Sequence, residues 1–245
     1  MKLLRGFLFI FSFIILLHGY SQPLRVNRIR IGIDPIRSLS MFFKEKDFYN
    51  NKFFYNTWEV NAEIIGPYRT SIVSEFGFTR AHIQQLNATL DYYSSGYYAK
   101  LGLDFNLTED HSKYEFDIGW RIAYAIYQDH SFINLEGKYW ETSMQKAYPE
   151  VKAHINWGEF IFNQKIRMFY SNHTLNDFYV GMAIRLKFMN GAPSMENFRN
   201  ISIPGYGPGS SFMPAVTFSL CYQFNIKRAK IKQLMHKHDN TYITR

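Results

Sequence analysis

Tyr114–Tyr127, YEFDIGWRIAYAIY, alternates apolar and polar side chains over its whole length. One face carries Phe116, Ile118, Trp120, Ile122, Tyr124 and Ile126, and the other carries Glu115, Asp117, Gly119, Arg121, Ala123 and Ala125. A period of two that is sustained this long indicates a β-strand with one apolar and one polar face. Because no charge interrupts the apolar face, the pattern is typical of a strand that lies between lipid and a polar lumen.

The same alternation recurs in seven further segments of the 245-residue chain, at 28–39, 57–65, 71–80, 96–106, 157–169, 178–189 and 212–226. Most of them match the roughly 9–11 residues that a tilted membrane-spanning strand needs. The connectors, 40–56, 66–70, 81–95, 107–113, 128–156, 170–177 and 190–211, alternate long and short, as outer loops and periplasmic turns do. We therefore predict an all-β fold, an eight-stranded antiparallel up-and-down transmembrane β-barrel, with a bulge at Pro35.

The first residues have the features of a secretory signal peptide. Lys2 and Arg5 form a short positive region ahead of an apolar run, Phe7–Leu17. Small residues then suit cleavage between Ser21 and Gln22. The apolar run is too short for a spanning helix, so we expect export of the chain rather than a retained membrane anchor.

Positive charge gathers at the C-terminus. Of the formal net charge of +8, Lys2 and Arg5 account for two and residues 227–245 for five, which leaves the remainder at +1. This balance argues against nucleic-acid binding, which needs a basic face on the folded domain. The tail has apolar residues at helical spacing among its lysines. The main expectation is a solvated end, and contact with anionic lipid is the alternative hypothesis. The predicted organisation is a signal peptide over 1–21, a barrel over 22–226 and a basic periplasmic tail over 227–245.

The polar faces of the predicted strands supply charges of both signs in near-equal numbers. An eight-stranded barrel has an interior just wide enough for side chains to fill, and an unpaired charge there is costly. We predict that these charges pair across the lumen and plug it, in preference to forming a pore or binding cavity. The network comprises Asp34, Glu59, Glu63, Glu75, Lys100, Asp104, Asp117, Arg121, Lys165, Arg167, Arg185 and Lys187, with Arg28, Arg30 and Glu115 on the same faces.

Motifs for catalysis or metal binding are weak. No Gly-x-Ser-x-Gly elbow and no His-x-x-x-His pair occurs, so we predict no catalytic residue, metal or cofactor. The enzymatic alternative is a lipid-modifying barrel that uses Ser143 and His154 of the longest loop. A third alternative is a soluble lipocalin-like carrier, with its apolar face inside. The Gly- and Pro-rich segment Ala192–Ser211 is predicted to be a turn-rich loop.

Aromatic residues are abundant in the first two long connectors. They are Phe48, Tyr49, Phe53, Phe54 and Tyr55, followed by Tyr92 and Tyr93. Because aromatic side chains are good binding anchors, the main functional prediction is a structural or binding role through long extracellular loops.

Four stretches carry a family resemblance: Gly32–Asp34, Gly96–Asn106 (GYYAKLGLDFN), Phe178–Phe188 (FYVGMAIRLKF) and Ile203–Gly207 (IPGYG). With them the chain resembles secreted proteins of Gram-negative bacteria that share a domain of unknown function and are regarded as outer-membrane β-barrels. The resemblance covers most of the mature chain. It implies an outer-membrane location, contact with lipid and with the barrel-assembly machinery, and no catalytic residues. The expected assembly signal is Phe218, Tyr222 and Phe224, although this chain continues past Phe224.

Overall fold

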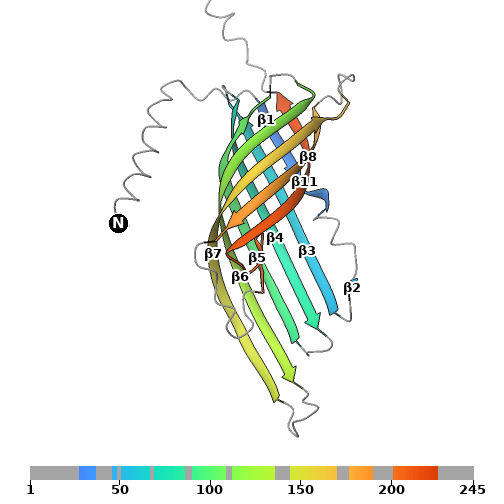
Figure 1. The fold of residues 1–245 in the computed structure, drawn as a ribbon, viewed down its shortest axis with the longest axis vertical. Helices are drawn as coiled ribbons and strands as arrows, with labels where there is room; N and C mark the ends of the chain where they lie inside the picture. Colours follow the sequence, from blue (N-terminus) through green and yellow to red (C-terminus); the bar gives the residue numbers. More distant parts are fainter. Residues whose placement is uncertain are drawn as a thin grey trace, which may run out of the picture.

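The computed structural model describes residues 28–36, 46–48, 51–66, 69–85, 90–108, 112–135, 144–169, 177–189 and 201–225. Within these ranges, eight strands form a closed ring: β1 (Arg28–Ile33), β3 (Asn51–Ile65), β4 (Thr70–Gln85), β5 (Leu90–Asn106), β6 (Tyr114–Leu135), β7 (Met144–Arg167), β8 (Phe178–Phe188) and β11 (Phe212–Asn225). Neighbours pair antiparallel in chain order, and β1 closes the ring by pairing with both β11 and β3 (Figure 1). The predicted eight-stranded up-and-down barrel is confirmed.

Three short strands complete the described structure. The strand β2 (Lys46–Phe48) forms a hairpin with β3, and β9 (Ser202–Ile203) pairs with β10 (Gly207–Pro208). Among the described residues, no helix is long and apolar enough to cross a membrane. The predicted signal peptide, the cleavage site at Ser21 and Gln22, and the basic tail over 227–245 lie outside the described residues.

Side chains alternate between the lumen and the outer surface along each strand. On β6, Arg121 is 3% exposed, whereas its neighbours Trp120 and Ile122 are 37% and 53% exposed. The outward residues of β6 are apolar from Tyr114 to Ile126. At a tilt of roughly 40°, this stretch covers about 30 Å along the barrel axis. We call the outward apolar surface of all eight ring strands at this level the outer band.

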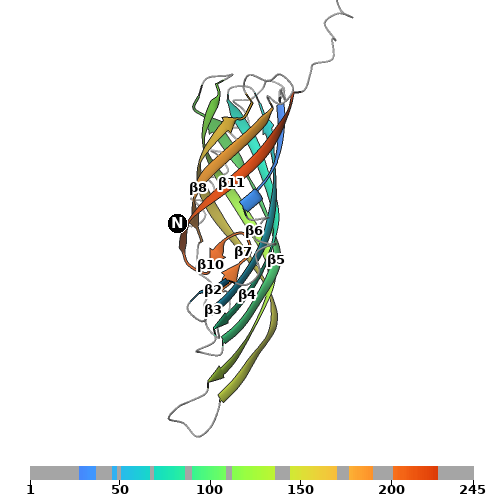
Figure 2. The ribbon, with the colours of Figure 1, turned by 90° about the vertical axis from the view of Figure 1, so that its right-hand side faces the viewer.

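The two ends of the barrel differ. We call the end at Arg28 and Asn225 the terminal end, and the opposite end, where the β6–β7 hairpin extends furthest, the hairpin end (Figures 1 and 2). At the hairpin end the strands run beyond the outer band and their outward residues become polar, as at Arg80, Gln128 and Lys152.

Five strands extend five or more residues beyond their predicted boundaries. The strand β3 begins at 51 instead of 57, β4 ends at 85 instead of 80, β5 begins at 90 instead of 96, β6 ends at 135 instead of 127, and β7 begins at 144 instead of 157. Beyond the outer band both faces of a strand can be polar, so the alternation fades while backbone pairing continues. The predicted loops 81–95 and 128–156 are therefore mainly paired strand extensions, and Tyr92 and Tyr93 lie in β5.

The first strand is shorter than predicted, and the expected bulge at Pro35 is wrong. The pairing of β1 with both neighbours ends at Ile33. One further contact follows, in which the Asp34 amide donates to the carbonyl of Glu59 at 3.2 Å. Pro35 lacks an N–H group and cannot continue the ladder, and Pro35 and Ile36 are helical.

Candidate functional site

Buried charges fill the barrel interior next to the terminal end. Arg30 on β1 contacts Glu63 and Glu115, each at 2.8 Å. Lys165 on β7 contacts Glu63 at 2.7 Å and Asp117 at 2.9 Å. These five residues, the first ion cluster, come from four strands and are all buried. The cluster therefore joins opposite walls of the barrel.

A second ion cluster lies further toward the hairpin end and is centred on Arg185. Its guanidinium donates two hydrogen bonds to Glu75, at 2.7 and 3.0 Å, and one to Glu159 at 3.0 Å. Arg121 donates two hydrogen bonds to Asp104, at 2.6 and 2.8 Å. Bidentate pairs of this kind fix geometry as well as charge. The full cluster comprises Glu59, Glu75, Lys100, Asp104, Arg121, Glu159 and Arg185.

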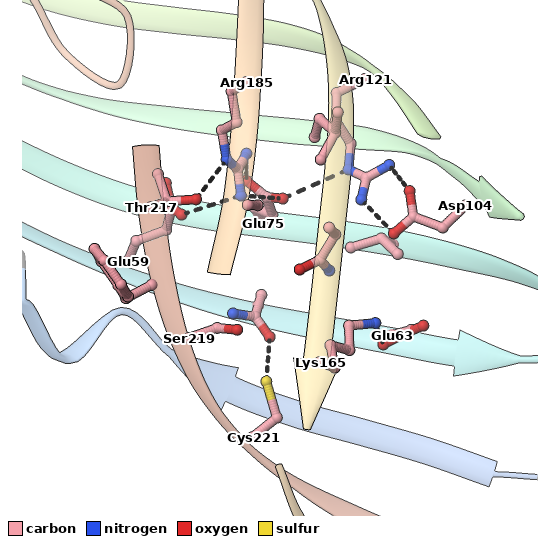
Figure 3. Close-up of a pocket in the computed structure, with 16 residues that line it drawn as sticks. Glu59, Glu63, Glu75, Asp104, Arg121, Lys165, Arg185, Thr217, Ser219 and Cys221 are labelled. Carbon is pink, nitrogen blue, oxygen red and sulfur yellow. Dashed lines mark hydrogen bonds and ion pairs between the residues drawn. The ribbon is translucent and has the colours of Figure 1, made fainter. Parts of the chain in front are cut away.

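The two clusters enclose a small polar cavity of about 40 Å³. Figure 3 shows Arg185, Arg121 and Lys165 pointing into this space from different strands. A cavity of this volume has room for about one or two water molecules. We refer to the two clusters together as the ion layer, and it leaves no space for a wide aqueous channel at this level.

Three carboxylates in this region have the spacing of a metal site. Oxygen atoms of Glu63, Asp104 and Asp117 lie within 4.8 Å of one another. The Lys165 ammonium, however, lies at 2.7 Å from Glu63 and 2.9 Å from Asp117. A lysine ammonium in this position supplies the positive charge that these carboxylates need.

Above the ion layer, toward the hairpin end, part of the segment between β8 and β11 inserts into the lumen. The β9–β10 hairpin, at residues 202–208, lies inside the barrel outline (Figure 2), and Ile203 and Tyr206 are buried. Their neighbours are aromatic and small residues of the opposite wall: Tyr98, Ala123, Ala125, Tyr127 and Trp157. We call residues 202–208 the plug. Of the predicted turn-rich loop Ala192–Ser211, residues 192–200 lie outside the described residues. The remainder has the predicted turns, but the prediction missed its burial.

Polar contacts hold the plug in place. The Lys187 ammonium donates to the carbonyl oxygens of Gly205 and Tyr206 at 2.7 and 2.8 Å. The Ser94 hydroxyl donates to the Ser202 carbonyl at 2.8 Å. The Tyr206 hydroxyl donates to the Ser210 carbonyl at 2.6 Å, and burial raises the pKa of this hydroxyl.

The remaining predicted network residues lie in the lumen but outside the two clusters. Arg167 donates to the Tyr179 hydroxyl at 2.6 and 2.9 Å. Lys187 binds the plug, and Asp34 is buried where β1 ends. Sequence reasoning missed Glu159, which is 3% exposed and bonds Lys100 and Arg185. Ile161 and Asn163 are both predicted to face inward. Continuing this alternation by two residues toward the N-terminus would have included Glu159.

Of the two residues named for the enzymatic alternative, the structure describes His154 but not Ser143. His154 faces outward, with its ring 6.4 Å from that of Tyr124, and Ser143 lies outside the described residues. A lipocalin-like barrel would have an apolar interior, whereas the ion layer makes this lumen charged. Phe218 and Phe224 face outward on β11, and the rings of Tyr222 and Phe224 lie 4.8 Å apart.

Comparisons with known proteins find similar solved structures and one matching family model. The attachment invasion locus protein Ail of Yersinia pestis is similar over 81% of this chain and 99% of that chain, at 9% identity and a TM-score of 0.39. The N-terminal β-barrel domain of Pseudomonas aeruginosa OprF is similar over 81% and 98%, at 6% identity and a TM-score of 0.34. A search of the curated proteins finds no match. The family described as a domain of unknown function, DUF6048, matches residues 24–229, and the chain belongs to this family.

Proposed function

We propose that this chain is a closed, non-conducting β-barrel of the bacterial outer membrane. The observation that carries the proposal is the inverted polarity of the barrel, with ions inside and apolar side chains outside. Exposed apolar residues occur on all eight ring strands, for example Ile72, Leu101, Ile122 and Ile184. An apolar surface of this extent is costly in water, and the outer band height of about 30 Å matches the hydrocarbon thickness of a bilayer.

Two obstructions in series support the absence of conduction. The ion layer fills the lumen on the side of the terminal end, and the plug fills one side of the lumen above it, toward the hairpin end. Removing an ion from water to pass this layer would require breaking several buried pairs, such as Arg185–Glu75 and Lys165–Glu63. Because each partner would be left as an uncompensated buried charge, the barrier is large.

The hairpin end supports a role in contact with an external partner. Three outward rings form a continuous stack, in which His82 and Tyr93 lie 4.0 Å apart and Tyr93 and His130 lie 4.8 Å apart. The Asp91 carboxylate lies 2.7 Å from His82 Nε2. These side chains stand on paired strands beyond the outer band and contact one another. Such a surface favours specific contact with an external partner over a purely structural role.

The aromatic residues that the sequence placed in extracellular loops have different positions in the structure. Tyr92 is buried in the lumen and Tyr55 lies on the inward face of β3, while Tyr93 belongs to the outward stack. The side chains of Phe48, Tyr49, Phe53 and Phe54 lie outside the described residues. We propose the strand extensions, rather than aromatic loops, as the external contact surface.

Membrane partners follow from the same proposal. Outer-membrane lipid would contact the outer band, and the barrel-assembly machinery would recognise the outward aromatics Phe218, Tyr222 and Phe224. Contact of the basic tail over 227–245 with anionic lipid is a further proposal. Deleting the tail should weaken binding of the barrel to anionic vesicles, while an unchanged affinity would contradict this role.

Fractionation combined with bilayer recording tests the main proposal. We expect the mature chain in the outer-membrane fraction, with a gel mobility that shifts on heating because the closed barrel unfolds. In planar bilayers we expect no stepwise conductance. A mature chain that stays soluble without detergent would overturn the membrane assignment, and a stable conductance would overturn the closed lumen.

A further inference from the structure

The described strands leave a break in the pairing of the barrel wall on the hairpin side of β1. Within the described residues, β1 provides register partners for Val60–Ile65 of β3 and Leu220–Asn225 of β11. On the edge of β3 that faces β1, pairing resumes with β2 at Asn51–Phe53. The strand β11 continues to Phe212, and there its described partner is β8 alone. Figure 1 shows β3 and β11 diverging below β1. Among the described residues, the ring is thus closed by hydrogen bonds at the terminal end and interrupted toward the hairpin end.

A large pocket lies behind this break. Its volume is about 530 Å³, within the roughly 300–1,000 Å³ of typical small-molecule sites. It occupies the part of the lumen that the plug leaves open, because the plug packs against the opposite wall formed by β5, β6 and β7. Its main apolar lining comes from Ile36, Tyr55, Ile83, Tyr206, Met213 and Ala215.

The pocket has few groups that could bind a charged ligand. Among the described residues that line it, Lys187 alone is charged, and this ammonium already donates to two plug carbonyl oxygens. Thr57 and Thr79 are bonded to each other, at 3.1 Å between their hydroxyl oxygens. An apolar chain therefore matches the pocket better than a sugar, nucleotide or peptide, whose polar groups would lose hydrogen bonds there.

The surroundings of the break indicate where such a chain comes from. Outward residues on both sides are apolar and exposed, with Val60 on β3 and Val216 on β11 at 39% and 56%. Ile36, at the end of the shortened β1 segment, is 53% exposed and lines the pocket. The described rim of the pocket is thus apolar on the side of the outer band, which in the proposed function faces the acyl chains of the membrane.

We propose that the pocket takes one acyl chain of a membrane lipid, which enters sideways between β3 and β11 while its headgroup stays at the membrane surface. This inference rests on the proposed membrane location. It assigns the chain a lipid-binding site inside the barrel wall, above the ion layer and beside the plug.

Photolabelling in vesicles tests the site. The full mature chain is reconstituted into phosphatidylethanolamine and phosphatidylglycerol vesicles that contain a trace of phospholipid with a diazirine near the end of one acyl chain. After irradiation, adducts are mapped by mass spectrometry. We expect adducts on inward Ile83 and Met213 as well as on outward Val216 and Phe218.

A matched pair of variants on β11 separates the pocket from the general lipid surface. Ala215→Trp fills the pocket from its inward face and should lower inward labelling about tenfold, equivalent to about 1.4 kcal/mol of binding free energy. Val216→Trp, its outward neighbour, should leave inward labelling unchanged. Heat-modifiable mobility checks folding of each variant, and Ile83→Asp, which places a carboxylate in the pocket, replaces Ala215→Trp if that variant does not fold.

The possible outcomes distinguish this inference from the proposed function. Outward adducts without inward ones would overturn the acyl-chain site and leave the membrane location intact. Inward adducts obtained only with a free photoreactive fatty acid added from water would overturn sideways entry. Equal inward labelling in the wild type and both pocket variants would also overturn the site, whereas loss of outward adducts would contradict the membrane location itself.

Discussion

At the scale of single residues, the interior depends on mutual satisfaction of buried charges. Arg185 is an example, because its guanidinium bonds Glu75, Glu159 and the Thr217 hydroxyl, all from different strands. The pairing of two buried charges offsets the free energy of removing them from water, and loss of one partner leaves the other uncompensated. Each charged residue of the ion layer therefore stabilises its buried partners and is not free to bind an external ligand.

Replacing Arg185 by leucine should destabilise the barrel strongly. Glu75 and Glu159 would keep their burial but lose the Arg185 guanidinium, so we expect a loss of about 3–5 kcal/mol in the free energy of unfolding. Urea titration of the vesicle-inserted protein measures this. The control is Arg80→Leu on the exposed outward face of β4, for which we expect a change within about 0.5 kcal/mol. Similar values for the two variants would contradict the structural role of the ion layer.

Gly205 is the residue on which the plug depends most directly. Its φ is +74°, and an added Cβ would lie 2.5 Å from the Tyr98 ring. Gly205→Ala should therefore displace the plug, at a cost of about 1–3 kcal/mol from backbone strain and overlap. We expect faster chymotrypsin cleavage after Tyr206, which is buried in the wild type. Gly66→Ala is the control, because the nearest atom to its added Cβ lies at 3.4 Å, and it should leave the cleavage rate unchanged.

At the scale of elements, each strand has two environments on its outward face. Along β6, Ile122 lies within the outer band, whereas His130 lies on the extension beyond it. The same backbone ladder passes through both regions, so strand pairing does not distinguish them. What changes is the surrounding medium, from hydrocarbon to water in the proposed orientation.

Two arginine substitutions on β6 should reveal this change. Ile122→Arg places a charge at mid-height of the outer band and should cost about 2–4 kcal/mol of folding free energy in vesicles, while His130→Arg should cost about 0–1 kcal/mol. Folding titrations into phospholipid vesicles provide both values. Equal costs would mean that the outer band does not face lipid.

At the scale of the whole molecule, closure of the ring sets the lumen width and brings the two obstructions into series. An eight-stranded barrel leaves an interior that side chains can fill, and here the plug and the ion layer fill it at different heights. The two obstructions use different residues. Among the described residues they meet through wall side chains that pack against the plug: the Tyr98 hydroxyl donates to Glu59 at 2.7 Å, and the Trp157 indole donates to Glu159 at 2.7 Å. Displacing the plug should therefore leave the ion layer in place.

Conductance of the Gly205→Ala variant tests this independence. We expect no stepwise current in planar bilayers, as for the wild type, because the buried pairs of the ion layer still block the lumen. Chymotrypsin cleavage on the same preparation confirms that the plug has moved. A current that appears only in this variant would show that the plug alone closes the barrel.

The sequence by itself determined the alternation of inward and outward side chains, and with it the strand count and the sorting of ions and apolar residues. These properties are local, because a period of two depends only on neighbouring residues along one strand. The inward set Glu59, Lys100, Arg121 and Arg185 could be read directly from this pattern. The strand ends could not, because beyond the outer band the polar contrast disappears while pairing continues.

Only the tertiary structure decided which charges meet, how the plug is held and where the wall is interrupted. Arg185 and Glu75 are 110 residues apart in sequence, and their contact depends on the stagger with which the strands close the ring. The burial of Ile203 and Tyr206 depends on space beside Tyr98 and Trp157 on the far wall. Such relations join distant strands, and no local pattern contains them, because the free energy of a buried contact depends on its partner as much as on the residue itself.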